Sequence, residues 1–374
     1  MTLGVPTELS DQEPRVALVP DAVRRLRKLE AEVLIESGLG KEIGLPDADY
    51  EKAGAVISKD RREVLEKSDV LLRVRPPSVD DLEGVRADTL QIGCMDPFKS
   101  GDLIGEFAKR KLNAIAMELV PRITRAQKMD VLSSQANLAG YVAVVIAADQ
   151  LDRIFPMMTT AAGTIAPARV FVLGAGVAGL QAIATAKRMG ARVEAYDVRP
   201  EVAEQVKSVG GKFVEIDVGQ TESTKDGYAK ALTDEQIKKQ QEAMASICSR
   251  SDVVITTANV FGGKAPRLVT AEMLDAMKPG SVVIDMAVES GGNVEGIEAD
   301  KVISRKDVSL IGYSNLPARV PVHASQVYAA NLVALIEEFW NQETKALELK
   351  PDDEILKSCL LTHQGEIVNE RFKS

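Results

Sequence analysis

The stretch that decides the fold runs Ala168-Arg-Val-Phe-Val-Leu-Gly-Ala-Gly-Val-Ala-Gly-Leu-Gln-Ala-Ile-Ala-Thr-Ala-Lys-Arg188. Its β-branched and aromatic beginning predicts a buried strand over 168–173, and its second half consists of good helix formers, which predicts a helix over 177–189. Three glycines lie at the junction, and the next predicted strand, 191–196, ends at Asp197, 18 residues after Gly179. A strand, a glycine loop, a helix and a second strand in this order predict a βαβ unit that binds a dinucleotide.

Each glycine of this loop has its own expected task, although glycines can also merely close a turn. Gly174 permits the tight turn, Gly176 lets the backbone approach a pyrophosphate, and Gly179 lets the helix pack close to the strand. The helix N-terminus offers free N–H groups and partial positive charge to phosphates. The expected phosphate-binding residues are Gly174, Gly176, Val177, Ala178 and Gly179.

The second strand ends in the segment expected to select the cofactor. Asp197 would accept hydrogen bonds from the adenosine ribose and repel a 2′-phosphate, so NAD(H) is expected rather than NADP(H). Arg199 complicates this expectation because a nearby arginine can accommodate that phosphate. With Val198 between them, these three residues complete the adenosine side of the predicted site.

Apolar runs alternate with amphipathic stretches along the whole chain, which predicts parallel sheets covered by helices. The expected strands of the N-terminal region are 31–36, 69–74 and 112–117, with helices at 21–29 and 101–111. The following region adds a helix at 134–149, an irregular segment at 156–167 and strands at 252–255, 281–284 and 308–311. No glycine-rich phosphate loop occurs before residue 170.

The C-terminal region of the chain is expected to return to the first domain. A helix over 323–342 has an apolar stripe, and two short apolar runs, 347–350 and 355–361, resemble a hairpin. The expected stripe consists of Ala324, Val327, Ala330, Leu332, Leu335, Ile336 and Phe339. The fold class is therefore α/β: two Rossmann-like doubly wound parallel-sheet domains separated by a cleft, with a C-terminal helix and hairpin returning to the first. The expected domains are 1–135, completed by about 325–374, and 136–324.

A polar insertion at 218–241 interrupts the second domain. Its first half lacks periodicity and is expected to be an exposed loop, whereas Thr233-Asp-Glu-Gln236 has the pattern of a helix capping box. Such an insertion beside a nucleotide site could be a lid or only a solvated excursion, and its composition leaves both open.

Composition excludes several classes of function. A formal net charge of −9 argues against nucleic-acid binding, which needs a basic surface. Three scattered cysteines and two histidines follow no metal-ligand spacing, so no metal is expected. The N-terminus lacks the regions of a signal peptide, and the most apolar run, 138–148, is shorter than the roughly 20 residues of a membrane span. A chain that does not insert into a membrane is expected, and docking onto a membrane protein stays open.

A second candidate site lies in the polar segment 117–135, between a predicted strand and the next predicted helix. Ligands of open α/β sheets bind just beyond the carboxyl ends of strands. Arg122, Gln127, Asp130 and Ser133 together offer donors, acceptors and a cation suited to a carboxamide. A salt-bridged surface turn would have the same composition.

The run Pro121-Arg-Ile-Thr-Arg-Ala-Gln-Lys-Met-Asp-Val-Leu-Ser-Ser-Gln-Ala-Asn-Leu-Ala-Gly-Tyr141 resembles the NAD(H)-binding component, domain I, of proton-translocating NAD(P) transhydrogenase. The segments 161–169, 179–188 and 285–293 are similar to it as well, and the likeness covers essentially the whole chain. The resemblance implies that Arg122, Asp130 and Ser133 position the nicotinamide, and that Gln127 brings it against the NADP nicotinamide of a partner domain. It also implies a mobile loop around Gly227 and Tyr228, and places Gln240 and Asn259 near the nucleotide. Asn259 departs from the aliphatic residue usual there.

The same resemblance implies hydride transfer from NADH on this chain to NADP⁺ on a partner subunit, coupled to proton movement. The implied partners are an NADP(H)-binding beta subunit and a membrane-spanning alpha segment, without which the enzyme would be inactive. A homodimer is implied too, in the cytoplasm and peripherally attached to the inner membrane.

Alanine dehydrogenase is the rival interpretation, because it shares the two-domain plan and the features Val5-Pro-Thr-Glu8 and Arg15-Val-Ala17. That enzyme needs a catalytic lysine and histidine in its first domain. This chain has Arg75 at the lysine position, and the stretch matching the histidine, 91–96, contains none. Arginine does not give up its proton near neutral pH. A non-catalytic NAD-sensing module is a third possibility, which would have no use for Arg122, Gln127 and Asp130.

Overall fold

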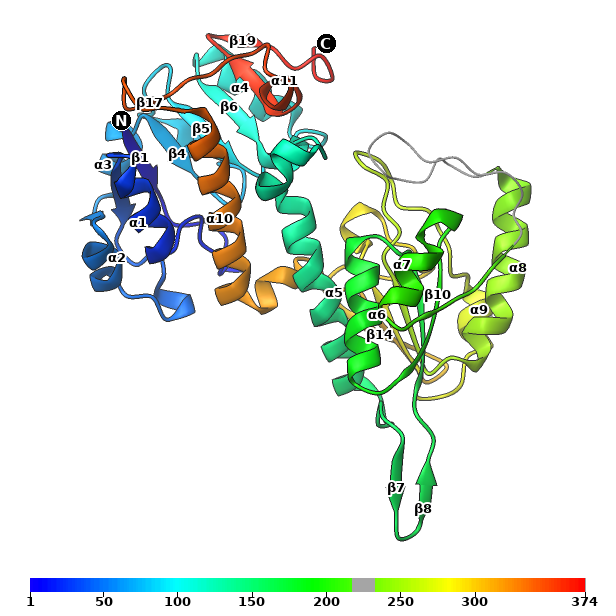
Figure 1. The fold of residues 1–374 in the computed structure, drawn as a ribbon. Helices are drawn as coiled ribbons and strands as arrows, with labels where there is room; N and C mark the ends of the chain where they lie inside the picture. Colours follow the sequence, from blue (N-terminus) through cyan, green and yellow to red (C-terminus); the bar gives the residue numbers. More distant parts are fainter. Residues whose placement is uncertain (217–232, 374) are drawn as a thin grey trace. The chain divides into compact units, whose positions relative to one another are not determined.

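Two parallel-rich sheets organise the chain in the computed structural model, which describes residues 1–216 and 233–373 (Figure 1). Each sheet belongs to its own compact unit. Unit 1 comprises Met1–Gln135 and Val320–Ser374, and unit 2 comprises Ala136–Arg319.

The sheet of unit 1 has the strand order β19-β18-β6-β5-β4-β1-β2-β3. Its strands are β1 (Thr2–Val5), β2 (Glu32–Glu36), β3 (Val56–Ser58), β4 (Val70–Leu72), β5 (Leu90–Gly93), β6 (Asn113–Ala116), β18 (Leu360–His363) and β19 (Glu366–Ile367). The six strands from β3 to β6 run parallel, and β18 pairs antiparallel with β6. The C-terminal segment thus returns to unit 1 as sheet strands.

Helices cover both faces of this sheet (Figure 1). They are α1 (Pro20–Lys28), α2 (Asp47–Ala53), α3 (Arg61–Lys67), α4 (Gly101–Lys109), α10 (Pro321–Phe339) and α11 (Glu354–Cys359). The α1 helix packs against both α2 and α10. In α10 the predicted stripe is buried at Ala324, Leu332, Leu335, Ile336 and Phe339. Ala330 is exposed instead, so the prediction was wrong at that position.

The sheet of unit 2 has the order β11-β10-β9-β12-β13-β15-β14. Its strands are β9 (Arg169–Leu173), β10 (Arg192–Tyr196), β11 (Lys212–Phe213), β12 (Val253–Thr256), β13 (Val282–Asp285), β14 (Val302–Arg305) and β15 (Val308–Ile311). All run parallel except β14. The strand order reverses between β9 and β12, which makes the carboxyl ends of these two strands the topological switch point.

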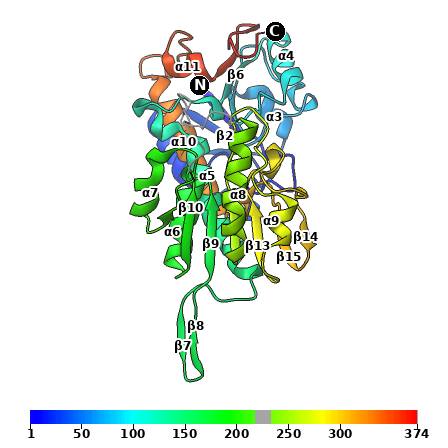
Figure 2. The ribbon, with the colours of Figure 1, turned by 90° about the vertical axis from the view of Figure 1, so that its right-hand side faces the viewer.

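The central strands of unit 2 are continuous apolar runs because helices cover both of their faces. The helices are α5 (Val131–Gln150), α6 (Val177–Arg188), α7 (Ala203–Ser208), α8 (Asp234–Arg250) and α9 (Ala271–Asp275). Figure 2 shows α6 and α7 on one side of the sheet and α8 and α9 on the other. The predicted fold class is confirmed: two doubly wound α/β sheets, with the C-terminal segment returning to the first.

Thr233 begins α8 through a capping box, as its sequence pattern predicts. Its side chain accepts a hydrogen bond from the backbone N–H of Gln236, whose side-chain oxygen accepts one from the N–H of Thr233 (3.0 Å). The loop predicted in the first half of the insertion lies largely outside the described residues.

Two local predictions were wrong. The segment 156–167, expected to be irregular, contains an antiparallel hairpin of β7 (Met158–Thr160) and β8 (Gly163–Ile165). The tail does not form a hairpin over 347–361. There, Asp353 caps α11 by accepting a hydrogen bond from the N–H of Ile355 (2.9 Å), and the hairpin follows as β18 and β19. Short apolar runs do not distinguish a helix from a strand, so the cap decided the outcome.

The α5 helix is long and apolar enough to cross a membrane by length and composition alone, with a mean hydropathy of 1.5 over 18 residues. This apolar stretch is longer than the run that the sequence suggested. Core helices meet the same criteria, and α5 packs closely on α6: a Cβ added at Gly140 would overlap the carbonyl oxygen of Ala178. That contact makes α5 a packed helix of unit 2.

Candidate functional site

The glycine loop lies at the switch point of unit 2, between β9 and α6. Gly174 has φ +99°, a left-handed conformation that glycine adopts without strain. A Cβ at Gly179 would overlap the carbonyl oxygen of Gly174, so only glycine lets the helix approach the strand this closely. At Gly176, in contrast, a Cβ would meet no atom of the described residues within 4 Å. Two of the glycines therefore serve the protein's own packing, whereas Gly176 faces open space.

The N-terminus of α6 has the electrostatics that an anion needs. Gly176 is its N-cap, and Leu180 is the first residue to donate back, to the carbonyl of Gly176 (2.8 Å). The N–H groups of Val177, Ala178 and Gly179 therefore lie in the first turn, where a helix offers them no internal acceptor. The sequence has no acidic residue in this turn, so the positive end of the helix dipole is not neutralised locally.

Asp197, at the end of β10, supports the glycine loop directly. One of its oxygens accepts a hydrogen bond from the N–H of Ala175 (2.7 Å). Arg199 folds back on the same carboxylate: its Nε and one terminal nitrogen each donate to it over 2.9 Å. The intervening Val198 packs against the apolar core. The cation that could have received a 2′-phosphate is thus paired with the carboxylate that would repel one.

Two polar groups of unit 2 that the sequence did not single out hold the loops of the switch point. Thr257 follows β12, and its hydroxyl donates to the carbonyl of Gly174 (3.2 Å). Asp285 accepts N–H bonds from Ala287, Asn293 and Val294. The amide of Asn293 donates to the carbonyls of Ala258 and Pro266, both 2.8 Å away. These two carbonyls lie in the loop that follows β12, so Asp285 and Asn293 fix that loop. The signal in the sequence was a buried-strand aspartate followed by Gly-Gly-Asn.

The remaining nucleotide candidates differ in position. Gln240 is buried in α8, where its Nε2 donates to the hydroxyl of Tyr196 (3.2 Å) and its Oε1 has no hydrogen-bond partner among the described residues. Asn259 is exposed, and its side chain accepts a hydrogen bond from the next residue's N–H. Gly227 and Tyr228 lie outside the described residues.

Three of the predicted carboxamide-recognising residues come together in unit 1. Asp130 accepts hydrogen bonds from the N–H of Ser133 (2.9 Å) and from its hydroxyl (2.6 Å). The Nε of Arg122 lies 3.9 Å from the same carboxylate. Gln127 is exposed on the adjoining 3₁₀ helix η4 (Thr124–Met129). The group combines a cation, a carboxylate, a hydroxyl and an amide within one short segment.

A buried asparagine on α10 holds this segment in place, and the sequence analysis missed it. Asn331 donates from Nδ2 to the carbonyl of Lys128 (2.8 Å) and accepts a hydrogen bond from the hydroxyl of Ser134 (2.7 Å). Arg125 adds an ion pair with Asp353 at the start of α11 (2.6 Å). An asparagine between apolar residues of a helix stripe was the available signal, because a buried amide needs partners.

The switch point of unit 1 lies between β1 and β4 and is filled by internal ion pairs. Arg15 makes two hydrogen bonds of 2.6 Å to the carboxylate of Glu13. Arg75 pairs with the same carboxylate (2.8 Å). Glu8 accepts the N–H groups of Val74 (2.7 Å) and Arg75 (3.1 Å). Arg75 therefore serves as a fixed cation in this network.

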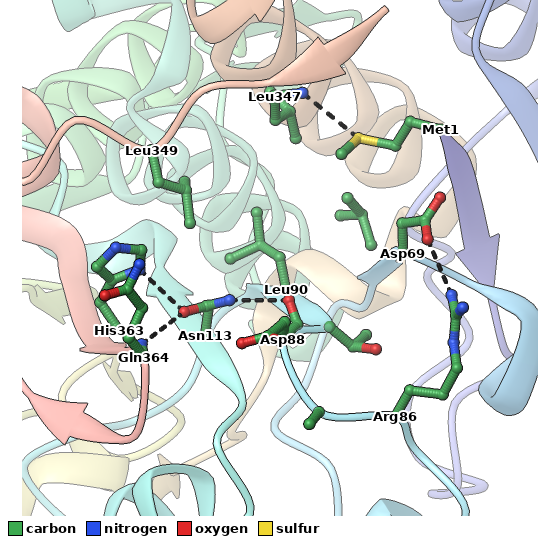
Figure 3. A pocket seen from close by; sticks show the side chains of 13 residues that line it. Met1, Asp69, Arg86, Asp88, Leu90, Asn113, Leu347, Leu349, His363 and Gln364 are labelled. Atoms are coloured by element: carbon green, nitrogen blue, oxygen red, sulfur yellow. Dashed lines mark hydrogen bonds and ion pairs between the residues drawn. The ribbon is translucent and has the colours of Figure 1, made fainter. Parts of the chain in front are cut away.

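A cavity of about 520 Å³ in unit 1 lies at the opposite edge of the sheet, at the amino ends of β4, β5 and β6. Figure 3 shows its wall, where Arg86 pairs with Asp69 (2.8 Å) and Asn113 donates to the carbonyl of Asp88 (2.8 Å). Dinucleotides bind at the carboxyl ends of such sheets. This cavity is therefore not a candidate for the nucleotide site.

Comparison with known proteins covers both units. The family model described as "Alanine dehydrogenase/PNT, N-terminal domain" matches residues 4–139, and the one described as "Alanine dehydrogenase/PNT, C-terminal domain" matches residues 143–370. The first of the separate alpha-subunit chains of the NAD(P) transhydrogenase of Rhodospirillum rubrum is 43% identical over 376 residues, which cover 99% of this chain and 98% of that protein. The chain belongs to the NAD(P) transhydrogenase alpha-subunit family.

Other members of the transhydrogenase family agree. The alpha subunit of Haemophilus influenzae is 39% identical and is covered over 71% of its length by 98% of this chain. The crystal structure of transhydrogenase from Sinorhizobium meliloti matches with a TM-score of 0.89 at 46% identity, over 98% of this chain and all of that one. The alanine dehydrogenase of Mycolicibacterium smegmatis is more distant, 27% identical over 99% of this chain. The resemblance found in the motifs is thus confirmed.

Proposed function

We propose that this chain is the NAD(H)-binding subunit of a proton-translocating transhydrogenase and passes hydride between NADH and NADP⁺ bound on a partner subunit. Family membership supports the general role, an NAD-binding oxidoreductase subunit. The observation that carries the proposal within the structure is the glycine loop, where the start of α6 is open and Gly176 faces free space. A pyrophosphate fits this arrangement because it needs N–H donors and close backbone approach.

The proposed contacts divide by unit. In unit 2, the residues from Gly174 to Gly179 would hold the pyrophosphate, and Asp197 with Val198 and Arg199 would contact the adenosine ribose. In unit 1, Arg122, Asp130 and Ser133 would bind the carboxamide of the nicotinamide, with Gln127 nearest to the partner's nicotinamide. Gln240, Asn259, Gly227 and Tyr228 remain proposed on resemblance alone. Asn259 has the weakest support, because its side chain bonds within its own turn.

Direct hydride transfer suits a site that is rich in hydrogen-bonding groups and has no histidine. NADH supplies the hydride from C4 of its nicotinamide to C4 of the acceptor, so no protein group needs to gain or lose a proton. The task of Arg122, Asp130 and Ser133 would be to fix the ring and exclude water. Held alignment of two reactants is worth several kcal/mol of barrier.

The proposed partners are an NADP(H)-binding beta subunit and a membrane-spanning alpha segment, which would place this chain on the cytoplasmic side of the inner membrane. A homodimer is also proposed, and the β7–β8 hairpin supports it. The hairpin extends from the body of unit 2 (Figures 1 and 2) and exposes Met157, Met158 and Ile165. A lone two-stranded hairpin is marginally stable in water and gains from a partner surface. Light scattering of the purified chain distinguishes a dimer from a monomer.

Gln127→Asn is expected to slow NADH-dependent reduction of NADP⁺ in the mixture with partner subunits by about tenfold, while NADH affinity stays within about twofold. The shorter amide keeps its chemistry but loses reach, so alignment should suffer more than binding. Stopped-flow transfer rates and calorimetric titration measure the two effects. Loss of binding with an intact transfer rate would contradict the proposed position of Gln127. The rival function is tested by adding L-alanine and NAD⁺ to the chain alone, where turnover would overturn the proposal.

The chain is expected to bind NADH at least about tenfold more tightly than NADPH, because the Asp197 carboxylate opposes a 2′-phosphate. Asp197→Asn should narrow this preference, since Asn retains an acceptor for Ala175 but leaves Arg199 without its countercharge. Calorimetry with both cofactors measures the ratio. Equal affinities in the unsubstituted chain would contradict the assignment to NAD(H).

A further inference from the structure

Glu118 occupies an unusual position for a carboxylate. It lies in the 3₁₀ helix η3 (Met117–Leu119), directly after β6, and leads into the segment that carries Arg122 and Gln127. Its Oε1 accepts two backbone hydrogen bonds, from the N–H groups of Met95 (2.7 Å) and Asp96 (2.6 Å). Those residues form the turn after β5. A single side-chain oxygen therefore ties together the turns that follow two neighbouring strands.

The other oxygen of Glu118, Oε2, is buried and has no hydrogen-bond partner within the described chain. An ionised carboxylate pays a large desolvation penalty for such an oxygen, whereas a neutral carboxyl pays less. Burial is the main cause that raises the pKa of Glu118, to about 7. The group therefore changes its charge near neutral pH instead of near its ordinary value.

The titratable groups around Glu118 do not offset this cost. Asp96, on the turn that it binds, is an acid and raises its pKa further. Cys94 of the same turn, Tyr328 of α10 and Cys359 of α11 also feel its charge. Burial raises the pKa of both cysteines to about 12, so these thiols are neutral at physiological pH. The side chain is held among neutral groups and one like charge.

The turn that Glu118 holds is itself constrained. Asp96 has φ +45°, a left-handed conformation that costs a non-glycine residue free energy. Its N–H group is one of the two that Glu118 accepts. Release of Glu118 would let this turn relax, and would at the same time free the start of the segment that follows η3.

We propose that Glu118 is a positioning residue whose neutral carboxyl locks the nicotinamide-binding segment 120–130 onto the turn after β5, and whose ionisation releases it. This inference rests on the proposed function of that segment. The direction follows from linkage: an acid with a raised pKa favours its buried arrangement while it is protonated, and it loses that preference as pH rises through the raised value. The lock is therefore complete on the acid side and weakens above about pH 7.

Comparison of two ligands isolates this effect. NADH affinity is expected to fall at least about threefold between pH 6 and pH 8.5, while the affinity for ADP-ribose, which lacks nicotinamide, stays constant. Glu118→Gln imitates the neutral carboxyl and should hold NADH affinity at its low-pH value throughout. Glu106→Gln on α4 is the matched control and should keep the pH dependence of the unsubstituted chain. Calorimetric titration at each pH provides the affinities.

Asp96→Asn gives an independent test that preserves Glu118. Asparagine tolerates the left-handed conformation, and loss of the like charge should move the midpoint of the NADH pH profile to lower pH. The inference is overturned if Glu118→Gln retains the full pH dependence, if ADP-ribose shows the same dependence as NADH, or if NADH affinity does not change with pH. A chain that binds neither ligand at any pH contradicts the proposed function instead.

Discussion

Gly176→Ala is expected to weaken NADH binding by about tenfold or more, about 1.4 kcal/mol, without lowering the thermal unfolding midpoint. An added Cβ at Gly176 meets no atom of the described residues within 4 Å, so the folded chain can accommodate it. The same Cβ would occupy the space through which the pyrophosphate approaches the start of α6. The mutation therefore separates the ligand's requirement for glycine from that of the fold.

Gly105→Ala is the matched control for this experiment. It also adds a Cβ in open space, but on α4 of unit 1, and should leave NADH affinity unchanged. Calorimetry gives the affinities, and scanning calorimetry gives the unfolding midpoints. NADH binding that survives in Gly176→Ala at full strength would refute the placement of the pyrophosphate at this loop.

Gly140→Ala is expected to destabilise unit 2 by about 2–3 kcal/mol, because the new Cβ would overlap the backbone carbonyl oxygen of Ala178. A backbone atom of a packed helix cannot move aside as a flexible side chain would. The α5 and α6 helices must separate, which also disturbs the helix that begins at the glycine loop. Urea unfolding followed by circular dichroism measures the loss.

The same substitution at Gly105 should have the opposite sign. Gly105 lies in a helix interior, exposed and with no described neighbour within 4 Å of an added Cβ, so alanine there should add about 0.5–1 kcal/mol through helix propensity. A stability loss at Gly105 equal to that at Gly140 would show that helical glycine has a general role here, and would contradict the explanation by close packing.

The sequence predicted the fold because its signals were local and consistent. The glycine loop, the alternation of strands and helices, and the capping box at Thr233 each gave one structural outcome. The tail was harder: its apolar runs fitted a strand or a helix, and only the cap at Asp353 distinguishes them. The β7–β8 hairpin was missed because its side chains are exposed on both faces, so no apolar alternation marked it.

Site residues were predictable where chemistry repeats a known pattern and hidden where position alone matters. The resemblance singled out Asp130 and Ser133, and the structure brings them within hydrogen-bond distance. Asn331 acts on a segment about 200 positions away along the chain, at the end of a return path that sequence spacing does not reveal. Thr257 and Glu118 likewise gain their roles from neighbouring strands, so only the assembled sheets identify them.

The most direct test of the central proposal mixes this chain with candidate NADP(H)-binding and membrane subunits and follows NADH-dependent reduction of NADP⁺. The account predicts transfer in the complete mixture, and none when this chain, or the subunit that holds NADP(H), is left out. Transfer that proceeds at the same rate without this chain would contradict it, and so would a complete mixture in which every subunit binds its cofactor but no hydride passes.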